Sequence, residues 1–164
     1  MQSLSIINMK TMGYQTSCII IFALLSFFIS PVTSHAQLNE TQKNKKLVMD
    51  FYTLAFVNKK VEEAINKYVG DIYIQHNPEV KNGKEGVIKF LSNLFNSHPQ
   101  MVFNVKRVIA EDDLVAIHYH SKMTPEDRGV AIVDIFRVDK GKIVEHWDVI
   151  QSIPEKSAND NTMF

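Results

Sequence analysis

One carboxylate stands in the middle of an otherwise apolar run, "GVAIVDIFRV", which extends from Gly129 to Val138. The valines, isoleucines and phenylalanine around Asp134 favour strands, so the sequence predicts that Asp134 is buried in a sheet. Burial of an isolated carboxylate is costly or forces it to keep its proton. A buried aspartate therefore indicates a partner or a chemical use, such as removing a proton from the carbon beside a carbonyl group.

Two histidines in "HYH" are candidates for that partner. His118 and His120 are two residues apart on a predicted strand, so both side chains leave the same face of the sheet. If that face also carries Asp134, an imidazole and a carboxylate come within reach. Such a pair removes a proton and holds the resulting enolate by hydrogen bonding. The other interpretation is a buried pair with only a structural role.

The segment "YIQHNP" offers a further candidate near a turn. In one interpretation one of Gln75, His76 and Asn77, with His76 preferred, reaches the mouth of a pocket and orients a substrate. In the other, this segment only caps the turn and the helix that follows, as Asn77 before a proline often does. The pattern His-x-His, together with His76 and an acid elsewhere, also has the ingredients of a non-haem metal site.

The segment "EHWDV" leaves open which side chain faces Asp134 across the last hairpin. A three-residue loop over Asp139–Gly141 would place His146 opposite Asp134, whereas a two-residue turn of Lys140 and Gly141 would place Trp147 there. Lys140 is a poor residue for the positive φ of the tighter turn, which favours His146. Trp147 is the better pocket wall, so both residues are candidates to line the pocket.

The elements that must position these residues change character halfway along the chain. Apolar spacing predicts helices over residues 38–57, 59–69 and 82–95, the last with Asn82 as N-cap and Glu85 closing a capping box, and an extended piece over 71–78. Four strand-like runs with short links follow over residues 101–112, 114–123, 129–138 and 142–150. Helices first and an antiparallel meander afterwards predict an α+β fold, with the helices on one face of a curved sheet.

The third predicted strand is apolar on both faces. Ile132, Asp134 and Phe136 point one way, while Ala131, Val133 and Ile135 point the other. Helices on one face leave the other to be covered. A second subunit packed sheet to sheet is one cover, and the C-terminal tail is the alternative.

The N-terminal segment predicts export. An apolar run over Cys18–Ile29 is too short for a spanning helix, follows Lys10, and is followed by "SHAQ" with small residues at Ser34 and Ala36. We predict a signal peptide over residues 1–36, cleaved after Ala36, and one domain over 37–164 in the periplasm or outside the cell. A retained membrane anchor is the alternative.

The composition limits the classes of binding partner that we expect. The single cysteine lies in the predicted signal peptide, so we expect no disulfide or cysteine metal site in the mature chain. Lysine and arginine number 18, as do aspartate and glutamate. This balance predicts neither a nucleic-acid partner nor, after cleavage of the signal peptide, a membrane surface, and leaves a small molecule or another protein.

Several of these motifs together resemble one family. "YIQHNP", "DRGVAIVDIFRV", "GKIVEHWDVIQ" and the ending "SANDNTMF" resemble the SnoaL-like proteins, relatives of polyketide cyclases in the nuclear transport factor 2-like superfamily. The resemblance implies a cone-shaped α+β fold, in which a curved antiparallel sheet is wrapped by N-terminal helices around a deep pocket, and a homodimer through the sheet. It also implies chemistry without metal or cofactor.

For the site, the resemblance implies Asp134 as catalytic acid and base, His120 as the assisting histidine, and His118 as a second polar pocket residue. We therefore predict a cofactor-free enzyme of the aldol-condensation or cyclisation type, a lyase or isomerase, acting on a hydrophobic carbonyl compound. Two alternatives stay open. One is an exported protein that binds a small ligand without catalysis, and the other is an isomerase or dehydratase on the same scaffold.

Overall fold

The computed structural model describes residues 30–164, with side chains from residue 36 onward. The compact unit that contains the sheet spans Asn39–Phe164, and the described residues 30–38 belong to a separate unit. The apolar run of the predicted signal peptide lies outside the described residues, so export stays a prediction. None of the helices in the described part of the chain combines the length and apolar character needed to cross a membrane.

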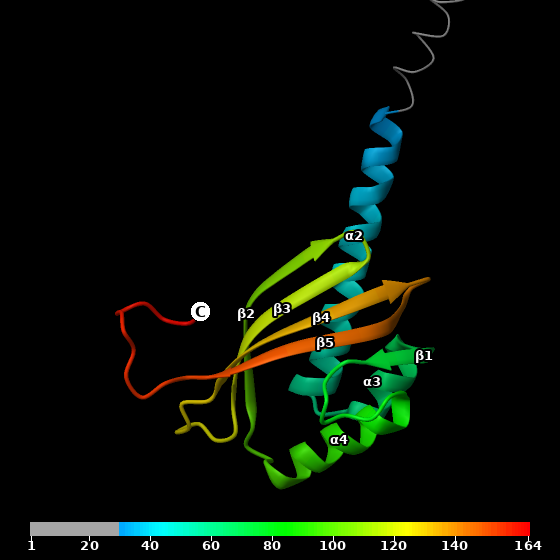
Figure 1. The fold of residues 1–164 in the computed structure, drawn as a ribbon. Coiled ribbons are helices and arrows are strands. Elements are labelled where there is room, and N and C mark those ends of the chain that lie inside the picture. Colours follow the sequence, from blue (N-terminus) through cyan, green and yellow to red (C-terminus); the bar gives the residue numbers. More distant parts are fainter. Residues whose placement is uncertain (1–29) are drawn as a thin grey trace, which may run out of the picture. The chain divides into compact units, whose positions relative to one another are not determined.

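The helical segments predicted from the sequence are all present (Figure 1). They are α2 (Ser30–Tyr52), continued by the π-helical turn η1 (Thr53–Val57), then α3 (Val61–Tyr68) and α4 (Lys84–Ser97). Two buried polar side chains of α2 bind the sheet: Thr41 Oγ1 and Asn44 Nδ2 both donate to the carbonyl oxygen of Asp112. This explains why a polar stretch of α2 packs against the domain.

The start of α4 differs from the prediction. Its N-cap is Gly83, with φ of 83° and no side-chain capping bond, so neither Asn82 nor Glu85 forms the predicted capping box. Asn82 Oδ1 instead accepts a hydrogen bond from the backbone N–H of Gln75, at 2.8 Å. The amide therefore ties the end of β1 to the loop before α4, a contact between residues that sequence periodicity does not reveal.

The sheet has five strands in the order β1-β5-β4-β3-β2. Strands β2 (Val102–Glu111), β3 (Leu114–Lys122), β4 (Val130–Asp139) and β5 (Lys142–Ser152) form the predicted antiparallel meander. The predicted extended piece becomes β1 (Val69–Gln75), which pairs parallel to β5 at the edge. The result is a mixed α+β fold with a curved sheet that does not close into a barrel (Figure 1).

The two faces of the sheet have different environments. The inner face packs against the helices: the ring of Phe51 in α2 lies 5.7 Å from that of Phe136 in β4, and Tyr52 lies 5.5 Å from Tyr119 in β3. Burial alternates along β3 and β4, as expected for strands with one covered face. Inner-face core residues include Val115, Ile117, Tyr119, Ile132, Phe136, Val138 and Ile143.

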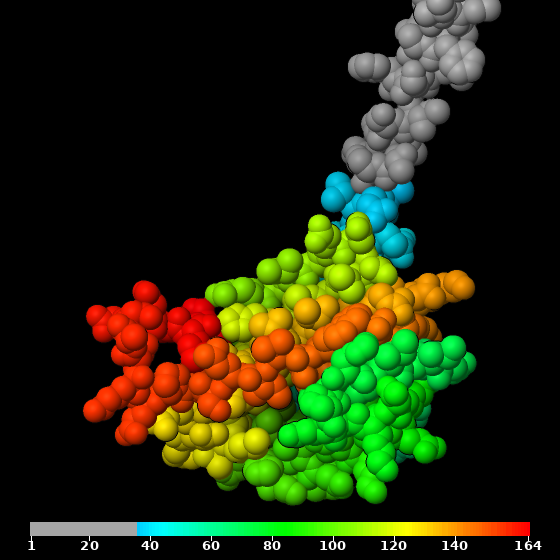
Figure 2. Space-filling model, viewed as in Figure 1, coloured from blue at the N-terminus to red at the C-terminus, as the bar shows by residue number. Residues whose placement is uncertain are grey.

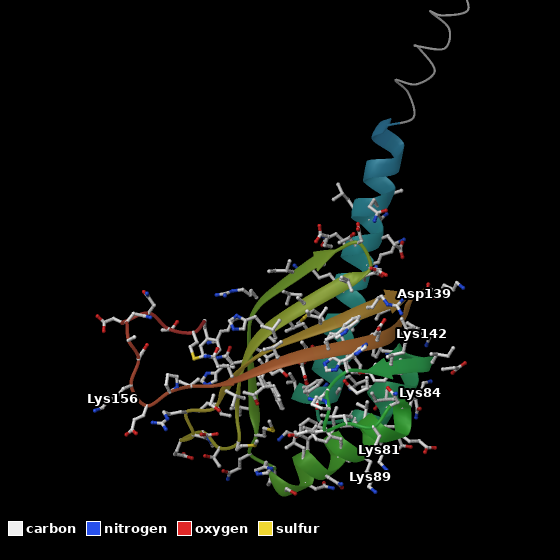
Figure 3. The ribbon with its side chains drawn as sticks, in the orientation of Figure 1. Lys81, Lys84, Lys89, Asp139, Lys142 and Lys156 are labelled. Atoms are coloured by element: carbon white, nitrogen blue, oxygen red, sulfur yellow. The ribbon has the colours of Figure 1, made fainter. Side chains whose placement is uncertain are left out.

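The last hairpin contains a bulge, so the residue opposite Asp134 is neither His146 nor Trp147 but Asp148. Lys140 and Gly141 form the two-residue turn with positive φ of 48° and 71°, so the argument against Lys140 in that turn is wrong. Val138 pairs with Ile143, but Arg137 pairs with Glu145, which leaves Val144 as an extra residue. Figure 3 labels Asp139 and Lys142, which pair at the tip of this hairpin.

The C-terminal tail covers part of the outer face. Figures 1 and 2 show the tail leaving β5 and curling back toward the strands. The ring of Phe164 stacks on His118 and His120, with centroids 5.4 and 4.6 Å away. A groove of about 380 Å³ separates Pro154 and Met163 of the tail from the sheet. The tail is thus a partial cover, and the homodimer through this face stays a prediction.

Gly129, at the start of the apolar run, cannot carry a side chain. Its φ is 77°, and a Cβ atom there would lie 2.1 Å from the carbonyl oxygen of Ser121. We expect Gly129→Ala to lower the free energy of unfolding by about 2–4 kcal/mol, measured by urea denaturation. Gly141→Ala is the matched control, because its φ is 71° but nothing lies within 4 Å of the added Cβ. Equal losses in the two variants would contradict a clash at Gly129.

Candidate active site

Asp134 lies in the middle of β4, on the inner face, and is 3% exposed. The prediction that this carboxylate is buried is therefore confirmed. Its cross-strand neighbour on β3 is Ile117, and its neighbour on β5 is Asp148. Two aspartates thus stand directly opposite each other on a covered face, an arrangement that is unfavourable when both are charged.

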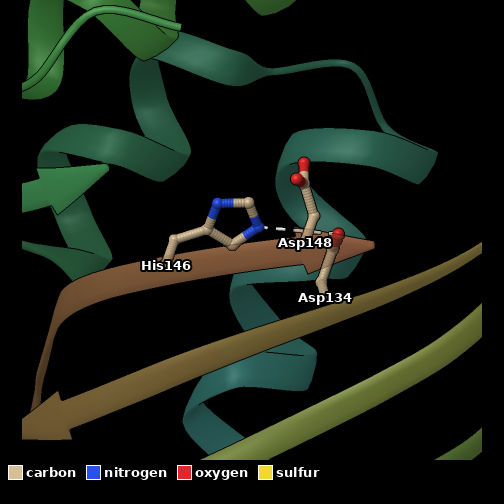
Figure 4. A group of neighbouring side chains, drawn as sticks. All are labelled: Asp134, His146 and Asp148. Atoms are coloured by element: carbon tan, nitrogen blue, oxygen red, sulfur yellow. Dashed lines mark ion pairs between the residues drawn. The ribbon is translucent and has the colours of Figure 1, made fainter. Parts of the chain in front are cut away.

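His146 completes the group (Figure 4). The bulge at Val144 brings His146 opposite Phe136, on the same face as Asp134, and its Nε2 lies 3.5 Å from Asp134 Oδ1. On the other side of the ring, Nδ1 lies 2.9 Å from Gln75 Oε1. That oxygen also accepts the backbone N–H of Asn77, at 2.9 Å. Because Oε1 is an acceptor, Nδ1 carries a proton and donates to it.

Asp148 is the member of the group closest to solvent. It is half-buried, and its Oδ2 accepts a hydrogen bond of 2.6 Å from Asn77 Nδ2. Asn77 follows β1, so the parallel edge strand supplies the amides that orient both His146 and Asp148. A molecule that approaches the group from solvent therefore meets Asp148 before Asp134.

Three buried tyrosines lie close enough to Asp134 for its charge to affect them. Burial, and secondarily the charge of Asp134, raises the pKa of Tyr119 well above its usual value, and Tyr119 also hydrogen-bonds to that carboxylate. Burial raises the pKa of Tyr73 in the same way, with Asp134 and Asp148 adding to the effect. Both phenols therefore keep their protons at neutral pH and act as hydrogen-bond donors. The hydroxyl of Tyr52 is buried without a hydrogen-bond partner.

The sequence matches a family model described as SnoaL-like polyketide cyclase over residues 46–156. This match covers more than half of the chain. The chain belongs to the SnoaL-like polyketide cyclase family. The resemblance stated from the sequence motifs is thereby confirmed. A search of the curated proteins found no match.

Solved structures share the SnoaL-like fold. A SnoaL-like protein of unknown function from Burkholderia thailandensis is 19% identical, with a TM-score of 0.57, and the match covers 69% of this chain and 98% of that one. AclR from Streptomyces galilaeus is 21% identical, with a TM-score of 0.57 and coverage of 68% and 90%. TsrD from Streptomyces laurentii is 19% identical, with a TM-score of 0.53 and coverage of 66% and 88%. At these identities the likeness is one of fold.

Two predicted site residues of this SnoaL-like chain do not join the group. Because Ile117 is the β3 residue opposite Asp134, His118 and His120 point to the outer face, away from that carboxylate. His120 Nε2 lies 2.7 Å from the carbonyl oxygen of Arg128, and both rings stack on Phe164. The prediction that His120 assists Asp134 is corrected, since the two side chains leave opposite faces of the sheet.

His76 and Trp147 also lie apart from the carboxylates. Trp147 pairs with Ile135 and shares its outer face, and the ring of His76 stacks on Trp147 at a centroid distance of 4.8 Å. His76 Nε2 is 2.9 Å from Glu145 Oε1, and Arg137 Nε donates to Glu145 Oε2 at 2.7 Å. Neither His76 nor Trp147 therefore lines the inner-face site, and of the six predicted residues the structure brings together Asp134 and His146.

The outer-face cluster around Glu145 predicts a pH effect on stability. His76, and then Arg137, hold the pKa of Glu145 below its usual value of 4.5 by hydrogen bonding. A carboxylate with a depressed pKa in the folded state stabilises the fold above its unfolded pKa, and this contribution is lost as the pH falls through the folded value. We expect Glu145→Gln to reduce the fall in unfolding free energy below pH 4.5, measured by urea denaturation from pH 6 to 3. An unchanged slope in this variant would exclude Glu145 as a source.

Proposed function

We propose that this protein catalyses acid/base chemistry at a carbon atom next to a carbonyl group, of the aldol-condensation or cyclisation type, on a hydrophobic compound. The supporting observation is the placement of Asp134, Asp148 and His146 together on the inner face, with only Asp148 partly open to solvent. Membership of the SnoaL-like polyketide cyclase family supports the same class of reaction.

The proton transfer begins at the half-buried carboxylate. Asp148, held by Asn77, removes a proton from the substrate carbon, and the electron pair of the C–H bond moves toward the carbonyl oxygen to form an enolate. The enolate carbon then attacks a second carbonyl carbon, which forms the C–C bond and leaves an alkoxide. Asp148 then returns the proton to that oxygen. The reaction therefore needs no oxidant or reductant.

The other residues of the site contribute charge or hydrogen-bond donors. Asp134 lies directly opposite Asp148 and next to His146, so its carboxylate contributes to the electrostatic field in which Asp148 acts. Tyr73 retains its proton and supplies a donor for an oxygen that becomes negative, whereas the Tyr119 hydroxyl is held by Asp134. His146, fixed by Gln75, replaces His120 as the imidazole next to Asp134 in this proposal.

Hydrogen–deuterium exchange at carbon tests the proposed function without knowledge of the natural substrate. The protein is incubated in D₂O with a panel of apolar ketones and 1,3-diketones, and loss of the proton signal next to the carbonyl is followed by NMR. Faster exchange of at least one compound than in buffer alone is the expected result. A compound that binds but exchanges no faster, across the whole panel, would instead support the non-catalytic binding protein.

Export of the protein and its assembly as a homodimer through the sheet remain parts of the proposal. Val149 of β5 is exposed on the outer face of the sheet, and the tail covers only part of this face, which supports a further partner there. The homodimer predicts a molecular mass of twice the chain by light scattering after size-exclusion chromatography.

A further inference from the structure

We propose that Asp134, His146 and Asp148 also form a binding site for a divalent transition-metal ion such as Zn²⁺. The three side chains offer one ligand atom each, and these atoms all lie within 4.8 Å of one another. Two come from β5 and one from β4, all on the inner face. One imidazole with two carboxylates is a donor set that zinc accepts, whereas Mg²⁺ and Ca²⁺ prefer oxygen ligands alone.

The positions of His146 and Asp134 suit a metal ion between them. Gln75 Oε1 accepts a hydrogen bond from Nδ1, so Nε2 is the ring nitrogen that faces Asp134. Nε2 lies 3.5 Å from Asp134 Oδ1. Two ligand atoms of a tetrahedral zinc ion, each about 2.0–2.2 Å from it, lie about 3.3–3.6 Å apart, which this pair already satisfies.

The negative charge of the two carboxylates also supports a bound cation. Asp134 and Asp148 bring two negative charges to one covered face, and within the described residues neither carboxylate forms an ion pair with a lysine or arginine. A divalent ion would balance both charges. The buried hydroxyl of Tyr52, which is 1% exposed and has no hydrogen-bond partner, lies close enough to Asp134 for that charge to affect its pKa. It is an additional polar atom beside the site.

The surroundings also resemble the outer shell of a metal site. Histidine ligands commonly donate their second ring N–H to an oxygen, as His146 does to Gln75, and carboxylate ligands are commonly hydrogen-bonded, as Asp148 is by Asn77. Both outer residues come from β1 or the residues directly after it. The partial exposure of Asp148 leaves a route for the ion to enter.

Calorimetric titration tests the site directly. The full chain is treated with EDTA, dialysed and titrated with ZnCl₂, and Co²⁺ is added in parallel to record its visible absorption. One zinc ion per chain is expected. Asp148→Asn and His146→Gln should each weaken zinc binding at least about 100-fold, and Gln75→Leu about 10–100-fold. Gln75→Glu should restore affinity, because it keeps an oxygen that accepts the Nδ1 proton.

The matched control removes histidines from the other face. His118→Gln with His120→Gln should leave zinc affinity unchanged, and circular dichroism confirms that each variant is folded. Absence of stoichiometric zinc binding, equal affinity in His146→Gln, or loss of binding in the outer-face double variant would each overturn the proposal. No substrate is needed, so failure here leaves the proposed acid/base function standing. A protein that binds zinc but exchanges no carbon-bound proton in its EDTA-treated form would refute that function alone.

Discussion

Asp148→Asn is expected to lower the rate of proton exchange at carbon by about 10²–10⁴-fold, the usual contribution of a general acid or base. The amide has nearly the shape of the carboxylate but cannot accept the proton. Because Asp148 is only half-buried, folding should be retained. Exchange rates of wild type and variant, measured by NMR with the most reactive ketone of the panel, provide the comparison.

Two further variants separate the roles of the carboxylates. Asp134→Asn should also abolish turnover and leave the fold intact, because it removes the carboxylate that lies opposite Asp148 and pairs with His146. Asp139→Asn, an exposed change at the hairpin tip labelled in Figure 3, should have no effect on exchange. A variant Asp148→Asn with exchange within twofold of wild type would exclude Asp148 as the base. Loss of exchange in Asp134→Asn alone would move that role to Asp134.

The fold could be predicted well from the sequence because its signals are local. Helical spacing, turn residues and strand-like runs identified all the main elements of the domain and the α+β class. The parallel pairing of β1 with β5 could not be predicted in the same way. It joins residues about 70 positions apart, such as Gln75 and His146, and depends on tertiary packing rather than on a local pattern.

The site was only partly predictable because the face of a side chain depends on register. Asp134 stood out as a carboxylate in an apolar run, but its partner depended on pairing with two neighbouring strands. A shift of one residue reverses the face of every side chain on a strand. The β3 register places Ile117 opposite Asp134, which sends His118 and His120 to the outer face. The single extra residue in β5 brings His146 and Asp148 inward.

Asp148 was missed, and His76 was preferred to Gln75 and Asn77, for related reasons. Asp148 lies in the quoted segment "EHWDV", but the two hairpin registers considered placed His146 or Trp147 opposite Asp134. A bulge leaves no clear signal in a single sequence. Gln75 and Asn77 flank His76, and histidine drew attention because of its chemistry, although its ring stacks on Trp147 outside the site. The two amides orient the site through hydrogen bonds that only the structure reveals.

Phe136→Ala should lower the free energy of unfolding by about 3–5 kcal/mol, the usual cost of removing a buried phenylalanine side chain. Phe136 is 2% exposed and lies two residues from Asp134 on the same face. Its ring contacts Phe51 of α2 at 5.7 Å and the ring of His146 at 4.8 Å. Urea denaturation followed by the fluorescence of Trp147, the single tryptophan, provides the measurement.

Ile135→Ala is the matched control, because Ile135 is the adjacent residue on the outer face and only half-buried. It should cost clearly less, about 1–2 kcal/mol, since less apolar surface returns to water and a partly open site leaves a smaller cavity. Equal losses would mean that both faces are equally packed, and the separation of His118 and His120 from Asp134 would lose its support. A large difference would confirm by energetics the alternation of faces that selects His146 and Asp148 as the neighbours of Asp134.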